Sequence, residues 1–152
     1  MAGDFGPLTK GVFPTILFET HADEMAQPFW DAAKDDRLVC QHCTGCGTFR
    51  MPPSPFCFKC QSRHHDFREL PGTGTIYSFT VVRHPLHPDL IDCCPYVSGV
   101  VELDGTQGAG ARMLVNIIDV DPDTVKIGDR VEIVFEHVND EMSTPRFRPI
   151  TS

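Results

Sequence analysis

The sequence predicts a mainly β protein in which a short N-terminal helix and a zinc ribbon precede a five-stranded OB-fold barrel (the oligonucleotide/oligosaccharide-binding type). Two Cys-x2-Cys pairs, at 43–46 and 57–60, are separated by a proline-containing stretch, which is typical of zinc ribbons. After the second pair, short runs rich in β-branched and aromatic residues alternate with turn signals, and little helix-forming sequence remains. We therefore divide the chain into an N-terminal arm with a short helix (1–36), a ribbon (37–69) and a barrel (70–152).

The composition is that of a folded, acidic protein. Hydrophobic residues make up 41% of the 152 residues, and the net charge is −8. An acidic chain without a basic run is a poor candidate for nucleic-acid binding, which needs clustered Lys and Arg. Residues 1–11 lack the basic start and apolar core of a signal peptide, and the chain has no long apolar run, so we expect a cytoplasmic protein without membrane contact. In that compartment, seven cysteines indicate a metal site rather than disulfides.

The stretch 12–18 is apolar but is interrupted by Pro14, so it is expected to be extended. Unless this segment folds back onto the barrel, it would leave an exposed apolar patch, which is typical of a docking element. Phe18 is our candidate partner-binding residue in this segment.

Residues 27–34 are expected to form a helix, because Pro28 suits the first helical turn. The apolar side of this helix consists of Phe29, Trp30 and Ala33. This side packs either on the same domain or on another subunit. Phe29 and Trp30 are our further candidates for partner binding.

The two Cys-x2-Cys pairs predict a metal site with four thiolates. Each pair makes a tight turn that directs two thiolates toward one point, and two facing turns give a tetrahedral cage. Such a cage suits Zn(II) and also a single iron. The ligands that we assign are Cys43, Cys46, Cys57 and Cys60.

Cys40 offers an alternative to this ligand set, because Cys40 and Cys43 have the same spacing. We prefer Cys46 as the second ligand, since Gly47 follows it directly and lets the chain turn back sharply. Cys40 is then a strand residue, and His42 is a fallback ligand only.

The strands follow from the periodicity of the sequence. In the ribbon we expect short strands at 37–40 and 49–51, with His64 and His65 as exposed polar residues. In the barrel we expect strands at 75–82, 96–103, 111–120, 131–136 and 146–150. Five strands with little helix favour an OB-type barrel, and a β-sandwich is the second choice.

A series of motifs in a fixed order gives a family resemblance. The series consists of Trp30, Cys43-x2-Cys46-Gly47, Pro52-Pro53, Cys57-x2-Cys60, Gly72-Thr73-Gly74-Thr75-Ile76-Tyr77-Ser78, Pro95-Tyr96-Val97, Val101-Glu102-Leu103 and Ile127-Gly128-Asp129-Arg130-Val131. From Gln27 to about Ile150, the chain resembles the acyl-CoA-associated family with an N-terminal rubredoxin-like zinc ribbon and a C-terminal OB-fold. It departs from that family in Cys40 and in the Cys93-Cys94 pair.

The resemblance implies an accessory subunit of a thiolase-like enzyme. Members of the family accompany acetyl-CoA acetyltransferases, heteromeric thiolases of aromatic degradation, and aldolases that shorten steroid side chains. The resemblance also implies that the barrel docks on a catalytic subunit and that the ribbon lies near the acyl-CoA entrance. The expected cofactor is Zn(II), and a CoA thioester is the expected substrate of the complex.

No catalytic apparatus is evident in the sequence, because thiolase chemistry needs a nucleophilic Cys, a His base and oxyanion donors held together. Cys93 and Cys94, with His84 and His87 nearby, could form a reactive thiol site or a second metal site. We favour partly buried cysteines in a barrel loop.

Arg83 and Arg112 are candidates for binding CoA phosphates, because Arg suits bidentate contacts with phosphate. The simpler interpretation is that both are solvated or ion-paired arginines.

Three functions remain open from the sequence. The first, which we favour, is a non-catalytic subunit of a thiolase or aldolase that acts on acyl-CoA thioesters, with no activity of its own. The second is a nucleic-acid-binding ribbon and barrel, which the acidic charge disfavours. The third is a rubredoxin-like electron carrier, in which the four thiolates would hold iron.

Overall fold

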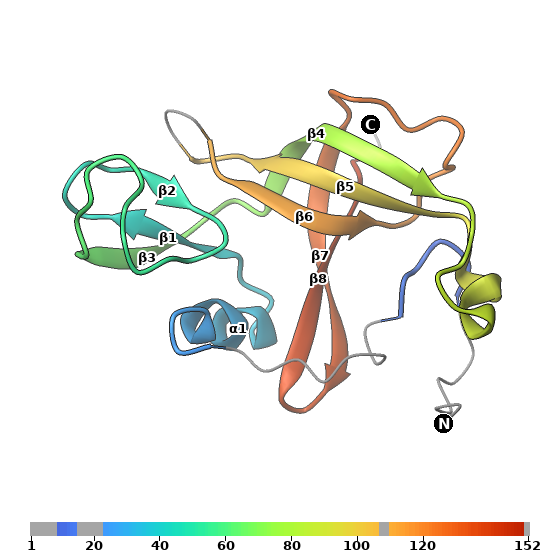
Figure 1. The fold of residues 1–152 in the computed structure, drawn as a ribbon, viewed down its shortest axis with the longest axis horizontal. Coiled ribbons are helices and arrows are strands. Elements are labelled where there is room, and N and C mark those ends of the chain that lie inside the picture. The colour runs from blue at the N-terminus through green and yellow to red at the C-terminus, as the bar shows by residue number, and fades with distance from the viewer. Residues whose placement is uncertain (1–8, 15–22, 107–109, 151–152) are drawn as a thin grey trace.

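The computed structural model describes residues 9–14, 23–106 and 110–150. In Figure 1 a three-stranded ribbon and helix α1 lie beside a larger barrel. The elements are α1 (Gln27–Lys34), β1 (Val39–Cys43), β2 (Phe49–Arg50), β3 (His65–Glu69), β4 (Thr73–Val82), the 3-10 helix η2 (Pro88–Cys93), β5 (Tyr96–Leu103), β6 (Arg112–Ile117), β7 (Arg130–Asn139) and β8 (Met142–Pro149). Among the described residues, no helix has the length and apolar character needed to cross a membrane.

The barrel is closed, with the strand order β4-β5-β6-β8-β7, which confirms the predicted five-stranded barrel over a sandwich. Strand β4 pairs antiparallel with β5 along its length and with β7 at its start. The barrel interior is filled by apolar side chains that alternate along these strands. Those that are almost fully buried are Ile76, Val97, Val101, Leu103, Ile117, Val131 and Phe147.

The strand pairing of the barrel is shortest where β6 meets β8. The two strands run parallel, and Ile117 opposite Phe147 is the one paired position in their register. The backbone N–H of Ile118 also donates to Phe147 O at 2.8 Å. Pro145 lies in β8 opposite Phe135 of β7. Because proline cannot donate to a ladder, its place in β8 agrees with an edge that is unpaired on the β6 side.

Helix α1 and the base of the ribbon share one hydrophobic cluster with the barrel. Phe29 and Ala32 of α1 and Leu38 at the start of the ribbon are buried in the same cluster as the barrel core. The backbone N–H of Leu70 donates to Leu38 O at 2.9 Å, so the chain enters and leaves the ribbon at adjacent points. Burial of this shared surface holds the ribbon and the helix on the barrel.

Gly74 is required by the close approach of β4 to β5. A Cβ at this position would lie 2.5 Å from the backbone oxygen of Glu102, which cannot move without displacing β5. We expect Gly74→Ala to lower the free energy of unfolding by about 1–3 kcal/mol. Gly99→Ala is the matched variant in β5, where the Cβ would clash with the side chain of Ile117 at 2.8 Å and would lie at an ordinary contact distance of 3.7 Å from the nearest backbone oxygen. Chemical denaturation should show the larger loss for Gly74→Ala, and equal losses would contradict this account.

The ribbon has three strands, in the order β2-β1-β3, where the sequence predicted two. Strand β1 begins at Val39 and continues to Cys43, beyond the predicted end at residue 40. The missed strand is β3, which pairs with β1 along its whole length and contains His65 in a half-buried position. The prediction of an exposed residue was therefore wrong for His65, whereas His64 is exposed. The sequence of β3, HDFRE, lacks the apolar alternation on which the strand predictions relied.

The first part of the predicted N-terminal docking segment folds back onto the barrel. The Gly11 N–H donates to Cys93 O at 3.0 Å, and the Phe13 N–H donates to Asn116 Oδ1 at 3.0 Å. The Phe13 ring also lies against Tyr96, with 5.1 Å between ring centroids. As far as residue 14, the segment therefore folds back onto the barrel, which is the alternative to an exposed docking element. Phe18 lies outside the described residues.

Candidate metal centre and docking groove

The two Cys-x2-Cys turns have the same backbone hydrogen bonds. In the first turn the Cys43 N–H donates to Thr48 O at 2.9 Å, and in the second the Cys57 N–H donates to Ser62 O at 2.9 Å. The carbonyl of each leading cysteine also accepts a hydrogen bond at 2.8 Å, from Gly47 in the first turn and from Gln61 in the second. Both of these donors have positive φ, at 74° and 61°. The sequence signalled this geometry at Gly47 only.

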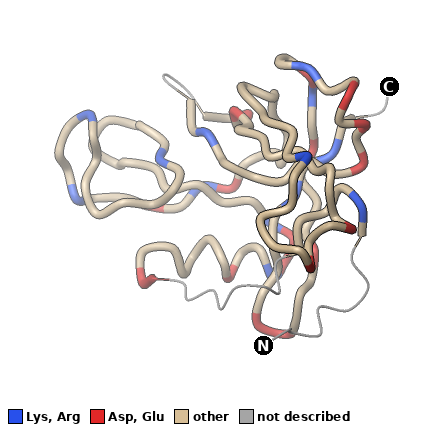
Figure 2. Tube along the Cα trace, turned by 45° about the vertical axis from the view of Figure 1, so that its right-hand side comes forward, with Lys and Arg blue, Asp and Glu red and all other residues tan. Residues whose placement is uncertain are grey.

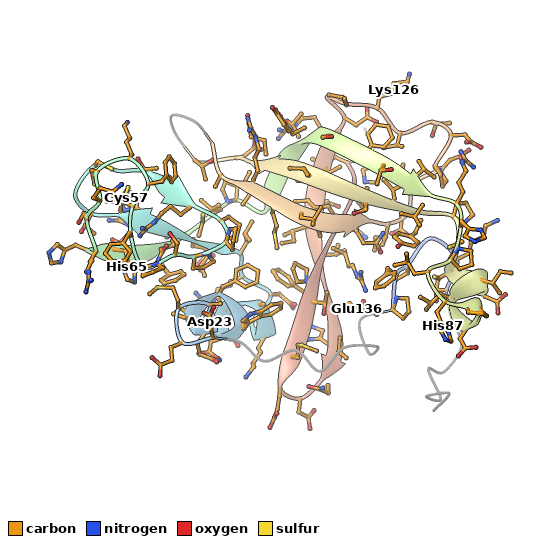
Figure 3. The ribbon with its side chains drawn as sticks, in the orientation of Figure 1. Asp23, Cys57, His65, His87, Lys126 and Glu136 are labelled. Atoms are coloured by element: carbon orange, nitrogen blue, oxygen red, sulfur yellow. The ribbon has the colours of Figure 1, made fainter. Side chains whose placement is uncertain are left out.

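The four predicted ligands converge on one point at the end of the ribbon, where Figure 3 labels Cys57. Their Sγ atoms all lie within 4.8 Å of one another, and Cys43–Cys60 and Cys46–Cys57 are each 3.6 Å apart. In a tetrahedral zinc site with Zn–S bonds of about 2.3 Å, the sulfurs are about 3.8 Å apart. The donor set and its spacing therefore fit Zn(II), and all four coordination positions would be filled by protein sulfur.

Local hydrogen bonds favour the thiolate form at two of these cysteines. The Cys46 Sγ lies 3.2 Å from Thr48 Oγ1, and hydrogen bonds from the side chain and backbone of Thr48 lower the pKa of Cys46 to about 6. The backbone N–H of Cys60 lowers the pKa of Cys57. Since the thiolate is the metal-binding form, these two shifts favour metal binding. In the absence of a metal, the adjacent Cys46 sulfur and burial raise the pKa of Cys60 to about 12, so the shifts within the cluster run in both directions.

The alternative ligands lie outside this cluster. Cys40 is buried in β1, and its thiol donates to the Arg50 carbonyl at 3.3 Å. Burial raises the pKa of Cys40 to about 11, which disfavours the thiolate. The His42 Nδ1 is 2.9 Å from Asp66 Oδ1, so this ring nitrogen is already held by a hydrogen bond outside the cluster. In the described part of the chain, the four-cysteine cluster is the one group of His, Cys and acidic residues close enough to hold a metal.

An apolar groove lies between α1, the loop Met51–Pro53, and the facing edges of β6 and β8. Its volume is about 730 Å³. It lies where β6 and β8 separate, on the N-terminal side of their one paired position. Leu114 of β6 lies at the groove with 74% of its surface exposed. An exposed apolar surface of this kind is typical of an interaction site.

The groove brings together three of the residues predicted for binding. Phe29 and Trp30 come from α1, with their rings 5.1 Å apart and nearly perpendicular. Phe29 is 5% exposed and belongs to the core, whereas Trp30 is half-buried and can offer a face to another molecule. Arg112 lies at the start of β6, where it pairs with Glu102 at 3.0 Å and stacks on Tyr77 at 3.6 Å from the ring centroid.

Arg83 is not part of this groove. It follows the end of β4 and forms an ion pair with Asp123. Arg112 lies opposite Glu102, which itself pairs with Thr75 near the start of β4. With strand residues about 3.3 Å apart, the two arginines are roughly 25 Å apart along the sheet. The structure therefore does not bring the two candidate phosphate ligands together.

Two buried polar residues of the groove, Arg146 and Asn116, were not anticipated from the sequence. Arg146 is 4% exposed, and its guanidinium donates to Glu136 Oε2 and, at 2.6 Å, to the Phe13 carbonyl. It also donates to Asn116 Oδ1 at 3.2 Å. A charged residue in a strand gives no signal of burial by itself, because strand faces exposed to water are also charged.

The two cysteines before Pro95 have different environments. Cys93 is fully buried at the end of η2, and Cys94 is half-buried. Cys94 agrees with the predicted partly buried loop cysteines, whereas Cys93 is fully buried and belongs to a 3-10 helix. Lys and Arg are scattered over the ribbon and barrel among acidic positions, as Figure 2 shows.

Comparisons with known proteins match both halves of this architecture. Residues 30–66 match the family described as the ChsH2 rubredoxin-like zinc ribbon domain, and residues 67–136 match the ChsH2 C-terminal OB-fold domain. A DUF35 domain-containing scaffold protein of Methanothermobacter thermautotrophicus is 39% identical over 68% of this chain and 75% of its own length. The chain belongs to the ChsH2/DUF35 family. This confirms the family resemblance and the predicted zinc ribbon and OB-fold.

Other members of the ChsH2/DUF35 family have names that refer to CoA enzymes. A probable enoyl-CoA hydratase alpha subunit of Thermomonospora curvata is 41% identical over 90% of this chain. A 3-oxo-4,17-pregnadiene-20-carboxyl-CoA hydratase alpha subunit of Mycobacterium tuberculosis is 33% identical over 88% of the chain. The chain spans 41% of the length of each of these two relatives.

A solved structure of the family has closely similar coordinates. The structure described as the Ltp2-ChsH2(DUF35) aldolase superposes with a TM-score of 0.74 at 37% identity, covering 86% of this chain and 98% of the matched chain. A DUF35 protein of unknown function from Sulfolobus solfataricus has the same fold, with a TM-score of 0.61 at 14% identity.

Proposed function

We propose that this chain is a non-catalytic, zinc-containing subunit of a heteromeric thiolase or thiolase-like aldolase that acts on acyl-CoA thioesters. The observation that carries the proposal is the apolar groove, which joins Trp30, the exposed Leu114 and Arg112 on one face. The names of related proteins support it, because they include alpha subunits of CoA hydratases and the Ltp2-ChsH2(DUF35) aldolase.

The groove is the proposed docking surface for the catalytic subunit. Permanent subunit interfaces are large and apolar, and an unshielded apolar surface on a small barrel is stabilised when a partner covers it. Trp30 and Leu114 would be the anchoring side chains. Phe29 would act indirectly, because it is buried in the core and holds the Trp30 ring in place.

Arg112 is the residue that we propose for contact with CoA phosphates. It lies at the rim of the groove, is exposed, and is already oriented by its stacking on Tyr77. Its ion pair with Glu102 is at the surface, so exchanging that carboxylate for a phosphate costs little. Arg83 is the weaker candidate, since it lies far from the groove at the other end of β4.

The zinc is proposed to be structural. A site closed by four thiolates leaves no position for a water or a substrate, so the metal would stabilise the ribbon and take no part in the reaction. The isolated chain is then expected to turn over no acyl-CoA, and any activity resides in the complex.

The test of docking is coexpression of this chain with a thiolase-like catalytic protein from the same organism. We expect the two to elute together in size-exclusion chromatography with light scattering, and Leu114→Asp to abolish the complex by placing a charge in the apolar contact. The control is Ile127→Asp, at a residue that is 68% exposed but outside the groove, and this variant should still assemble.

Acyl-CoA turnover by the same samples separates the two parts of the proposal. The Leu114→Asp mixture should lose most of the activity of the wild-type complex, while zinc content stays the same in both variants. A catalytic partner that is fully active without this chain would overturn the proposed function. Equal assembly by both aspartate variants would overturn the groove as the docking surface.

A further inference from the structure

Arg50 of β2 is a buried cation without a partner. Its side chain is 3% exposed, and none of its three guanidinium nitrogens has a hydrogen-bond partner in the part of the chain that the structure describes. A guanidinium stays protonated in proteins, and a buried charge that is neither paired nor hydrogen-bonded is strongly unfavourable. The chain by itself therefore leaves this positive charge uncompensated.

The neighbours of Arg50 in the ribbon do not compensate its charge. Gln41 lies opposite Arg50 in the register of β1 and β2, so the two side chains share one face of the ribbon. The Gln41 amide is itself buried, and its oxygen accepts from the Ser54 N–H at 2.9 Å. Burial raises the pKa of Cys40 to about 11 in spite of the opposing charge of Arg50, so this thiol is neutral. Neither neighbour supplies a negative charge.

The ribbon face that holds Arg50 borders the wall of the apolar groove. The Gln41 amide nitrogen lies 3.1 Å from the sulfur of Met25, next to the N-cap of α1. Figure 1 shows α1 directly below the ribbon. The residues that follow Arg50 directly, Met51–Pro53, line the groove together with the start of α1. Arg50 therefore lies next to the surface on which we place the catalytic subunit.

The other arginines of the groove are already paired. Arg146 pairs with Glu136, and Arg112 pairs with Glu102. Arg50 is therefore one uncompensated positive charge, which matches the single negative charge of an Asp or Glu side chain. A phosphate monoester carries a charge of about −1.5 to −2 and would exceed this single charge.

We propose that Arg50 is the anchor for an acidic side chain of the catalytic subunit. This inference rests on the proposed function, because it names what the docked subunit contributes at the groove. On docking, a carboxylate of that subunit enters beside Met51 and forms a bidentate ion pair with the guanidinium. Met51 is half-buried and unbranched, so its side chain can move aside while the backbone stays in place.

The pair would also select the partner. A subunit with a carboxylate at this place compensates the buried charge, whereas a subunit without one leaves Arg50 enclosed and unpaired. Arg50 thus lowers the stability of the free chain and raises that of the correct complex. These opposite effects distinguish a docking anchor from an arginine that only supports the fold.

The test compares Arg50→Met with the wild-type zinc-loaded chain, first alone and then with the catalytic subunit. In the free chain, the midpoint of thermal unfolding should rise by about 3 °C or more, because an apolar side chain of similar length replaces an unpaired charge. In isothermal titration calorimetry with the catalytic subunit, the same change should raise Kd at least about tenfold. Arg50→Lys keeps the charge but loses the planar fork, so its Kd should lie between the two.

Arg68→Met is the matched control in the ribbon. The Arg68 side chain is 57% exposed and pairs with Asp66 at 2.7 Å on the surface. Because exposed pairs contribute little, this variant should shift the thermal midpoint by about 1 °C at most and Kd by less than about twofold.

A lower thermal midpoint for Arg50→Met would overturn the inference, because the guanidinium would then be stabilised within the chain itself. An unchanged Kd would also overturn it, including the case in which the variant complex assembles normally but binds CoA more weakly, since the ligand of Arg50 would then be a phosphate. Failure of the wild-type chain to bind the catalytic subunit would overturn the proposed function as well. Wild-type binding with an unaffected Arg50→Met would overturn this inference alone.

Discussion

Cys57→Ser is expected to remove zinc from the protein. Cys57 is a fully buried member of the four-sulfur cluster, and its Sγ lies 3.6 Å from Cys46 Sγ. A serine hydroxyl is a poor substitute for a thiolate, and the binding free energy of a structural zinc is largely folding free energy. We therefore expect elemental analysis to show less than a tenth of the wild-type zinc, and the ribbon amides to lose their dispersion in NMR spectra.

The barrel should survive this change, because its closed sheet does not depend on the metal. Cys40→Ser is the matched control in the ribbon, since Cys40 is equally buried but hydrogen-bonds to the Arg50 carbonyl outside the cluster. It should keep its zinc in full. Full zinc in Cys57→Ser, or zinc loss in Cys40→Ser, would contradict the ligand set.

Arg146→Ala is expected to cause the largest loss of barrel stability among single arginine changes. The substitution removes hydrogen bonds to Glu136, Asn116 and the Phe13 carbonyl from a buried site. The free energy of unfolding should fall by about 2–4 kcal/mol, because hydrogen bonds of a charged group are lost and the buried Asn116 side chain loses one of its donors. Urea denaturation followed by circular dichroism measures this loss.

Arg148→Ala provides the control two residues further along β8. Its side chain is 47% exposed and pairs with Glu132 at 2.9 Å on the surface. Exposed pairs of this kind contribute at most about 1 kcal/mol. If the two variants lost the same stability, the buried network around Arg146 would not contribute as described.

The sequence was sufficient where one strong local signal determined the structure. The spacing of Cys43, Cys46, Cys57 and Cys60 predicted the cluster that the structure shows. The helix at 27–34 and the strand at 96–103 have the predicted bounds, because a proline start and a regular alternation mark them.

The sequence failed where an element depends on its neighbours. Strand β3 is polar and exists because it pairs with β1, which no local pattern reveals. Strand β8 begins at Met142 and not at the predicted residue 146, since Ser143-Thr144-Pro145 has the composition of a turn but pairs with β7.

The groove could not be predicted from the sequence, because it depends on long-range geometry. It arises because β6 and β8 share a single paired position, and this separation is a property of barrel closure that neither strand encodes alone. Trp30 and Arg112 could be selected from their chemistry, but their place in one groove could not be read from residues so far apart in sequence.

The hydrogen bond between Leu70 and Leu38 has a consequence for how such a protein can be built. Because the chain leaves the ribbon next to the point where it entered, the ribbon is an inserted segment whose two ends are adjacent. A short hairpin turn could replace it without rerouting the barrel strands, as is true of inserted domains whose termini are close together. Such a replacement would have to cover the apolar surface that Leu38 and Val39 now share with the barrel core.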